Sequence, residues 1–155
     1  MVNEHQLKHR ALTEQIIKTF YEVYNELGHG FLESVYEKAF ELGLVSRGLD
    51  VRRKIEVPVW FRGHRIGDFE ADMLVERCVL IELKACRALE AAHEAQLLNY
   101  LRATEIEVGL LFNFGPRPQF RRLAFDNRRK ARPGTPVSFL EQLFSDAEKD
   151  PKPKN

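Results

Sequence analysis

A short apolar run in the middle of the chain places the tightest limit on its fold. The run from Val79 to Ala85 is apolar except at Glu82 and Lys84. Burying a charge without a partner is expensive, so a strand this apolar needs a reason to hold both residues. Because the side chains of a strand alternate between its two faces, Glu82 and Lys84 share one face. The run therefore predicts a buried strand with two ionisable side chains on one side.

Two strands are expected before this run. Apolar and polar residues alternate from Val51 to Phe61, which predicts a half-buried strand. Pro58 cannot donate to a ladder, so this strand should lie at a sheet edge or carry a bulge. Residues 62–65, Arg-Gly-His-Arg, predict a hairpin turn, and Ile66 to Val75 predict the returning strand. The three strands are therefore expected to be antiparallel neighbours.

The other elements follow from periodicity in the same way. Apolar residues three and four apart predict helices, and short apolar runs bounded by turn residues predict strands. A helix between two buried strands predicts a right-handed parallel crossover. The expected elements are a helix from Glu4 to Leu27 that ends at Gly28, a helix from Leu32 that stops at Gly43 or Gly48, a helix from Leu89 to Thr104, a buried strand from Val108 to Phe114, a strand from Phe120 to Phe125 and a short helix from Val137 to Phe144.

These elements predict an α/β fold with a mixed central sheet flanked by helices. The core order is two helices, three antiparallel strands, a helix and a parallel strand. A length of 155 residues matches one ordinary domain, which we expect to occupy residues 1–145. The tail at 146–155 ends in KDPKPKN, which has no apolar residue to bury, so we expect it to be disordered.

Composition excludes several classes of protein. The cysteines, Cys78 and Cys86, form no Cys-x-x-Cys pair for a zinc or iron–sulfur site. No apolar stretch approaches the length that spans a bilayer, and the polar N-terminus does not look like a secretion signal. We therefore expect a reduced, cytoplasmic protein with no membrane partner. The formal net charge of +1 says nothing about partners.

The length of the turn after the second strand decides whether Asp72 joins Glu82. A two-residue turn would pair residue 75 with 78 and leave Glu82 on the opposite face. A three-residue turn at residues 76–78 would pair Val75 with Val79 and place Asp72 directly across from Glu82. We favour the second, which would bring the two Cβ atoms within about 5 Å. Two carboxylates this close suit a shared cation and would otherwise repel each other.

This pair predicts a site for a hard divalent cation, Mg²⁺ or Mn²⁺. Mg²⁺ prefers oxygen ligands and retains several waters, so Asp72, Glu82 and a backbone carbonyl, such as that of Leu83, would suffice. Lys84 would orient the attacking water or stabilise the transition state, and the reaction would be phosphodiester hydrolysis. Glu-x-Lys is nevertheless a common tripeptide, and an exposed Asp/Glu/Lys ladder would give the same pattern.

Polar residues on two helices are further candidates. His93, Gln96 and Tyr100 form one stripe with Leu89, and Gln96 or Tyr100 could reach a phosphate or a water at the site. His93 fits the margin of the core somewhat better than a role in the site. Glu33 lies one turn before Tyr36 and could bring a carboxylate into the pocket, although an acidic residue also suits the first turn of a helix.

A basic run near the C-terminus is open to two interpretations. Its members could bind a nucleic-acid backbone, or they could form a solvated surface. A smaller cluster at residues 52–54 has the same two interpretations. The run contains Arg117, Arg121, Arg122, Arg128, Arg129, Lys130 and Arg132, with Asp126 as its single acid.

The sequence also resembles a known family. GHGFLESVYEKAF fits the motif that names the GxxExxY proteins, and DFEADMLVERCVLIELKA followed by AQLLNYLRATEIEVGLLFNFG is similar to the rest of that family. The similarity covers about residues 7–126, and these proteins are assigned to the PD-(D/E)XK nuclease superfamily, which has a restriction-endonuclease-like core. Ala71 stands where the superfamily motif has proline. The resemblance implies Asp72 and Glu82 as metal ligands, Lys84 as the catalytic lysine, Glu33 as the acidic residue of the first core helix and Gln96 as the polar residue of the later helix.

The leading hypothesis is a Mg²⁺-dependent nuclease acting on nucleic acid, with DNA as the expected substrate. Its proposed nucleic-acid contacts are Tyr36, Tyr100, Arg117, Arg121 and Arg122. The first alternative is a catalytically silent module of the same fold that binds nucleic acid or serves in assembly. The second is a metal-dependent hydrolase of a smaller phosphate ester. Because a domain this small has little surface to grip a duplex, a homo-oligomer is also considered.

Overall fold

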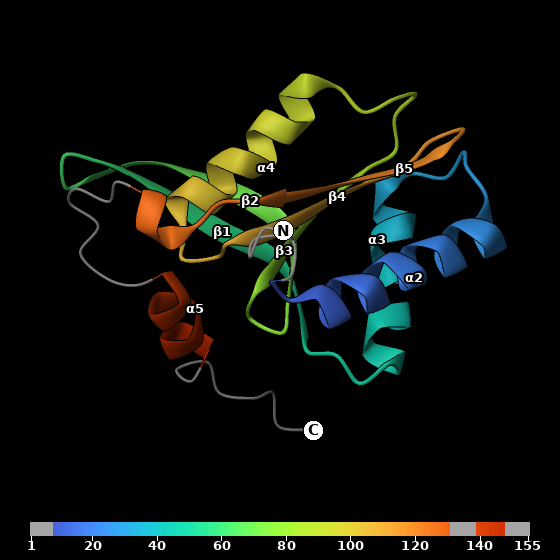
Figure 1. The fold of residues 1–155 in the computed structure, drawn as a ribbon, viewed down its shortest axis with the longest axis horizontal. Coiled ribbons are helices and arrows are strands. Elements are labelled where there is room, and N and C mark those ends of the chain that lie inside the picture. The colour runs from blue at the N-terminus through green and yellow to red at the C-terminus, as the bar shows by residue number, and fades with distance from the viewer. Residues whose placement is uncertain (1–7, 131–138, 148–155) are drawn as a thin grey trace, which may run out of the picture.

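The sheet at the centre of the molecule is mixed, with five strands in the order β1-β2-β3-β4-β5 (Figure 1). The computed structural model describes residues 8–130 and 139–147, so the expected helix start at Glu4, Arg132 and most of the expected tail lie outside it. The elements are α2 (Arg10–Leu27), α3 (Glu33–Ser46), β1 (Val51–Phe61), β2 (His64–Val75), β3 (Val79–Lys84), α4 (Ala91–Ala103), β4 (Val108–Phe114), β5 (Pro118–Ala124), the 3-10 helix η1 (Asn127–Arg129) and α5 (Phe139–Ala147).

Strand pairing confirms the predicted fold class. Strands β1, β2 and β3 are consecutive and antiparallel, and β4 is parallel to β3. Helix α4 connects β3 to β4, as expected for a parallel crossover. Strand β5 adds an antiparallel edge beside β4. Strand β1 forms the other edge, which accommodates Pro58, and its register shifts between Val59 and Trp60.

Helices cover the two faces of the sheet and form two hydrophobic clusters. Helices α2 and α3 pack on one face, where Phe20 and Phe40 contact Phe112 of β4. Helices α4 and α5 pack on the other, where Leu97 and Phe139 are buried. Figure 1 shows α2 and α3 together and apart from α4 and α5. Every residue of β4 is buried, as its apolar run predicts.

Glycines follow the first two helices, and another glycine lies inside the second. Gly28 ends α2 with a φ of 68°, as predicted. Gly43 does not stop α3, because the helix continues to Ser46 and Gly48 follows it. Gly43 instead allows α2 to approach, since a Cβ there would lie 2.7 Å from the Thr19 side chain. This glycine is therefore a packing position and not a helix stop.

The first two strands change face in the middle, which simple alternation did not predict. Val51 packs with the cluster under α2 and α3, whereas Ile55 and Val57 belong to the cluster under α4. The change occurs at Lys54, whose φ of 55° is left-handed. Lys54 lies between the pairs Arg53–Met73 and Ile55–Ala71, so it lies opposite Asp72. The distortion of the sheet is therefore centred on a candidate site residue.

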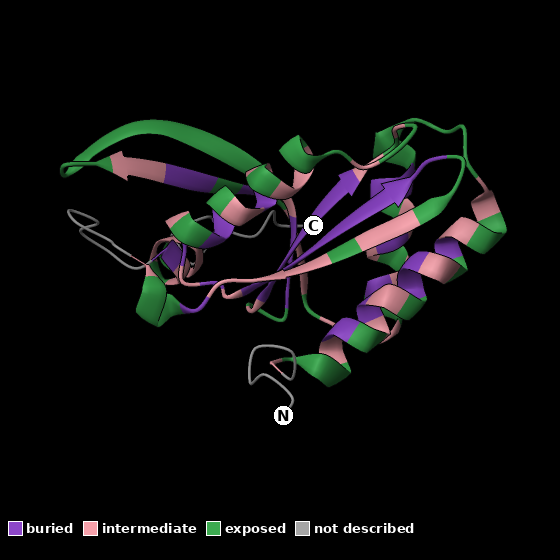
Figure 2. Cartoon of the chain, turned by 45° about the horizontal axis from the view of Figure 1, so that its top comes forward, coloured by how far each residue is buried: buried purple, intermediate pink, exposed green. Residues whose placement is uncertain are grey.

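The hairpin between β1 and β2 extends beyond the rest of the sheet. Its turn has only two residues, Arg62 and Gly63, with φ of 49° and 79°, so β2 begins at His64 and not at Ile66. Both values are positive, as a tight hairpin turn requires. All residues of β2 from His64 to Glu70 are exposed, and this green arm is clear in Figure 2. The arm is therefore available for contact with another molecule.

The loop after β3 is fixed to the end of β4. The buried Asn113 side chain accepts a hydrogen bond from the Cys86 N–H at 3.0 Å and donates one to the Cys86 carbonyl at 2.9 Å. The Leu89 N–H donates to Gln119 Oε1 at 3.1 Å. Gly115 lets the two segments meet, since a Cβ there would lie 2.0 Å from the Cys86 carbonyl oxygen. These contacts hold the chain immediately after Lys84.

We expect Gly115→Ala to destabilise the protein strongly because its methyl group would collide with backbone. Overpacking typically costs about 1–3 kcal/mol in the free energy of unfolding, and a collision with backbone should lie at the upper end of that range. Thermal and urea unfolding would measure it. Gly67→Ala is the matched control, since nothing lies within 4 Å of a Cβ at that exposed position. Equal stability of the two variants would contradict this account of the loop.

Candidate active site at the opening between β2 and β3

The register of β2 and β3 is the one that a three-residue turn predicts. Val75 pairs with Val79, Leu74 with Leu80 and Met73 with Ile81. The next positions in this register are Asp72 and Glu82, and the ladder ends before them. The two acidic residues therefore lie across from each other where the strands separate.

Each carboxylate bonds to the backbone of the opposite strand. The Asp72 N–H donates to Glu82 Oε1 at 3.1 Å, and the Leu83 N–H donates to Asp72 Oδ2 at 2.7 Å. These bonds satisfy two backbone donors that the open ladder would otherwise leave unpaired. The second oxygen of each carboxylate, Asp72 Oδ1 and Glu82 Oε2, accepts no hydrogen bond from the residues that the structure describes.

Burial and mutual repulsion disfavour the charged form of both acids. Desolvation is the largest cause for each, and it raises the pKa of Glu82 to about 8 and the pKa of Asp72 to about 6. The Asp72 charge raises the pKa of Glu82 further, and those of Glu37 and Glu33 raise that of Asp72. Lys84 opposes both shifts. Because the acids interact, their protons leave the pair in two coupled steps.

A hydrogen-bonded chain connects Lys84 to helix α4. Lys84 Nζ donates to Gln96 Oε1 at 3.2 Å, Gln96 Nε2 donates to the Tyr100 hydroxyl at 3.0 Å, and that hydroxyl donates to the Glu70 carbonyl at 3.4 Å. Burial and the Glu82 charge raise the pKa of Tyr100 to about 12, so its hydroxyl stays protonated at neutral pH. Gln96 therefore positions the ammonium group beside the acids.

Helix α3 brings a carboxylate that sequence reasoning missed. Glu33 opens α3 and is exposed, whereas Glu37, one turn later, is buried and bonds to Arg53 Nε at 3.1 Å. Glu37 acts on the pKa of Asp72 more strongly than Glu33 does. Its i, i+4 spacing from Glu33 was the available signal. Arg53 belongs to the cluster at residues 52–54, so that residue is engaged within the molecule.

Tyr36 lies in the core, contrary to the expectation that it contacts nucleic acid. Its side chain is fully buried, and its ring stacks on Phe114 with centroids 4.4 Å apart. The hydroxyl donates to the Gly28 carbonyl at 2.6 Å and accepts from the Phe31 N–H at 3.2 Å. Tyr36 therefore fixes the loop that precedes Glu33. Tyr100 is also buried, at 2% exposure, and reaches the site through Gln96.

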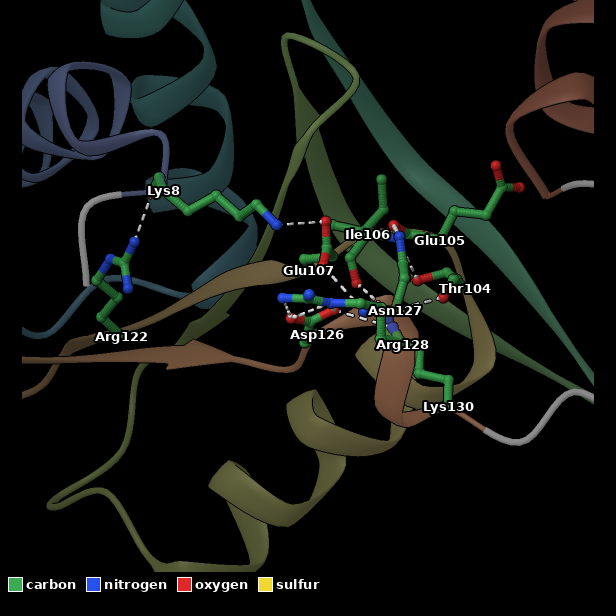
Figure 3. Close-up of polar contacts among 10 residues, drawn as sticks. All are labelled: Lys8, Thr104, Glu105, Ile106, Glu107, Arg122, Asp126, Asn127, Arg128 and Lys130. Atoms are coloured by element: carbon green, nitrogen blue, oxygen red, sulfur yellow. Dashed lines mark hydrogen bonds and ion pairs between the residues drawn. The ribbon is translucent and has the colours of Figure 1, made fainter. Parts of the chain in front are cut away.

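Most of the basic run is engaged within the molecule. Arg121 pairs with Glu94 of α4 at 3.1 Å, and Arg122 donates to the Lys8 carbonyl at 2.6 Å. Arg128 pairs with Asp126, and Lys130 Nζ donates to the Thr104 and Ile106 carbonyls. Figure 3 shows Arg122, Arg128 and Lys130 in these contacts.

The strand register separates the Lys130 contacts from the site, whereas Arg121 pairs with Leu111, which is also the partner of Glu82. Lys84 pairs with Asn113 near the end of β4, whereas the Lys130 contacts precede Val108 at its start. Five residues of strand separate the two ends by about 17 Å. Arg117 is different, since it is exposed in the turn after β4, at the same end as Lys84.

The acidic pair fits a small hard cation. Within the described ranges, no group of three or more His, Cys, Asp or Glu side chains is arranged to hold a metal ion, so Glu33 is not gathered with the pair. Mg²⁺ requires few protein ligands because it retains water. Asp72 and Glu82 each offer one oxygen without a hydrogen bond, and a cation between them would offset the repulsion that disfavours their charged forms.

His93 has a structural contact at the start of α4. Its Nδ1 accepts a hydrogen bond from the Glu90 N–H at 3.0 Å, which completes a capping box.

Cys78 and Cys86 are both free. No helix among the residues that the structure describes has the length and hydrophobicity to cross a membrane.

We expect Glu82→Gln to stabilise the metal-free protein at alkaline pH. A carboxyl group whose pKa is raised on folding does not lower the free energy of unfolding below the pKa of the unfolded state, near 4.5. Above that pH it lowers the free energy of unfolding progressively, until the pH passes the pKa of the folded state, about 8. Each pKa unit corresponds to about 1.4 kcal/mol, and each kcal/mol to about 2–4 °C in Tm.

Thermal unfolding in EDTA should therefore show a Tm for Glu82→Gln at least about 3 °C above wild type at pH 8.5, and little difference at pH 5. Glutamine keeps an oxygen for the Asp72 N–H. Glu26→Gln, at an exposed position of α2, is the control and should match wild type at both pH values. A lower Tm for Glu82→Gln at pH 8.5 would contradict the electrostatic account.

Comparison with known proteins identifies the family. No curated protein matches the chain. The solved structure titled "Crystal structure of SSO0001" matches with 18% sequence identity and a TM-score of 0.49, covering 93% of this chain and 69% of that chain. A family model described as "PD-(D/E)XK nuclease superfamily" matches residues 10–123. The mixed sheet flanked by helices agrees with the restriction-endonuclease-like fold of such proteins, and the chain belongs to the PD-(D/E)XK nuclease superfamily.

Proposed function

We propose that this protein is a Mg²⁺- or Mn²⁺-dependent nuclease that hydrolyses phosphodiester bonds of nucleic acid, with DNA as the substrate. One observation carries the proposal: Asp72 and Glu82 face each other at the opening of the sheet, beside a lysine that Gln96 holds in place. Superfamily membership supports nuclease chemistry. Asp72 and Glu82 would hold the metal ion, and Lys84 would be the catalytic lysine.

Within the superfamily, we assign the chain to the GxxExxY proteins. The local structure gives each residue of that motif a physical reason. Gly30 has a φ of 109°, which favours glycine, and Glu33 is the first residue of α3. Tyr36 closes the loop through its hydroxyl. The motif would therefore set the position of the acidic start of α3 relative to the sheet.

The side chains divide the work of hydrolysis. A bound divalent cation would neutralise charge on the phosphate and make a water more acidic. The Lys84 ammonium would donate to the attacking water or to a phosphate oxygen on which charge develops. Gln96 would orient Lys84, and Tyr100 would orient Gln96. Arg117, at the same end of the sheet, would contact the backbone of the substrate.

Cleavage assays test the chemistry directly. Purified protein would be incubated with supercoiled plasmid, linear duplex, single-stranded DNA and RNA, each with Mg²⁺, Mn²⁺ or EDTA. We expect cleavage only with a divalent cation, and we expect Lys84→Ala and Asp72→Asn to lower the rate about 100-fold or more. Lys38→Ala changes an exposed lysine of α3 and should cleave as wild type does.

Other outcomes would assign a different function. Activity of Lys84→Ala equal to that of wild type would contradict the proposed mechanism. Binding that weakens steeply with salt, without cleavage under any condition, would identify a catalytically silent module. Turnover of a chromogenic phosphodiester together with indifference to nucleic acid would identify a hydrolase of smaller esters.

Metal binding can be measured without activity. We expect 10 mM Mg²⁺ at pH 8 to raise the Tm of wild type, since a ligand at ten times its Kd stabilises the folded state by about 1.4 kcal/mol. Asp72→Asn and Glu82→Gln should lose this shift, because each removes a proposed ligand. Glu26→Gln should retain it. An equal shift in all four proteins would contradict a site at Asp72 and Glu82.

The cellular setting is part of the proposal. We assign residues 1–145 to one catalytic domain acting in the cytoplasm, where the free cysteines would remain reduced. Sedimentation equilibrium of the protein alone and with a duplex would test whether a homo-oligomer forms.

A further inference from the structure

A groove lies beside the candidate site, between the β1–β2 hairpin and helix α4. Its volume is about 410 Å³. Phe69 of β2 lines one side, and the α4 residues Ala92, His93, Ala95, Gln96, Asn99 and Tyr100 line the other. Figure 1 shows α4 crossing the sheet beside this hairpin. Of its lining residues, the proposed mechanism uses Gln96 and Tyr100 and gives no role to the others.

The lining suits a flat, uncharged occupant. None of the lining residues is Asp, Glu, Lys or Arg, so a phosphate would find no fixed counter-charge. The Phe69 side chain is 46% exposed, and its ring centroid lies 5.5 Å from that of Tyr100. The Asn99 carboxamide is exposed and could bond to the polar edge of a ring. An exposed aromatic face with amide groups nearby matches a nucleobase.

The groove and the candidate site share a wall. Gln96 lines the groove and accepts the hydrogen bond from Lys84 Nζ at 3.2 Å. Tyr100 also lines the groove, and the Glu82 charge is near enough to raise its pKa. A nucleotide whose phosphate lies beside Lys84 would therefore find the groove one side chain away. The candidate site has the charged Lys84 and suits a phosphate, whereas the uncharged groove suits a base.

We propose that this groove binds an unpaired nucleobase of the substrate strand, stacked on Phe69. The inference rests on the proposed function, since it takes the strand to be cleaved as the ligand. A base within a duplex is already paired and stacked, so placing it here requires its extrusion. The protein therefore prefers single-stranded or locally unpaired nucleic acid.

Fluorescence of 2-aminopurine reports stacking without any cleavage. A DNA 12-mer with one central 2-aminopurine would be titrated with protein in EDTA, as a single strand and as a perfect duplex, while anisotropy of an end label measures binding. We expect wild type to quench the single strand strongly and the duplex weakly. Phe69→Ala should lose most of the quenching and bind about tenfold more weakly, because base–aromatic stacking is worth about 1–3 kcal/mol.

Two variants control for folding and for exposure. Phe69→Trp keeps an aromatic face and should retain the quenching, whereas Phe61→Ala removes another exposed aromatic residue of the hairpin and should behave as wild type. The inference is overturned if Phe69→Ala quenches as wild type does, if the paired base is quenched equally, or if the single strand does not bind.

The proposed function and this inference can fail separately. If wild type and Phe69→Ala both cleave single-stranded DNA at the same rate, and Asp72→Asn cleaves neither strand nor plasmid, the function stands and the groove assignment falls. If wild type cleaves nothing but shows quenching that depends on Phe69, the groove binds a base and the nuclease proposal falls.

Discussion

Two hydrogen bonds from backbone to carboxylate hold the sheet open between β2 and β3, and the site depends on them. Each acid satisfies an N–H of the other strand, at Asp72 and at Leu83, where the ladder has ended. The left-handed residue Lys54 on β1 lies opposite the same point. Strand β1 thus departs from regular geometry where the ladder between β2 and β3 ends, while β3 stays in register with β4. The opening leaves two acidic groups facing each other, and the residues next to them on the strands, Ala71, Met73, Ile81 and Leu83, are buried and apolar.

The elements around this opening each fix one part of it. Helix α4 holds Lys84 through Gln96, and the buried Asn113 anchors the loop that joins β3 to α4. Helix α3 adds negative charge from Glu37, which Arg53 holds in place. The acids come from two antiparallel strands, and their partners come from both layers of helices. Because helices cover both faces of the sheet, partners reach the site from both sides.

Local patterns predicted the strands and the register, because a half-buried strand shows its faces in its sequence. A three-residue turn was enough to place Asp72 across from Glu82. Contacts that join distant segments could not be predicted. The partners of Arg121 and Arg122 lie in α4 and beside α2, so those arginines looked free. The spacing of Tyr36 from Glu33 fits a site residue, but its hydroxyl bonds to the loop before α3. The change of face at Lys54 had no signal, since lysine rarely adopts a left-handed conformation.

The burial of Asp72 and Glu82 has a consequence for how any cation would enter. Near neutral pH the pair retains a proton that free carboxyl groups would have lost. A cation that binds there would have to displace that proton. Its apparent affinity for the site would therefore depend on pH. The heat of that exchange would depend on the ionisation enthalpy of the buffer. Acidification of the medium would therefore weaken the binding of a cation by competition from protons.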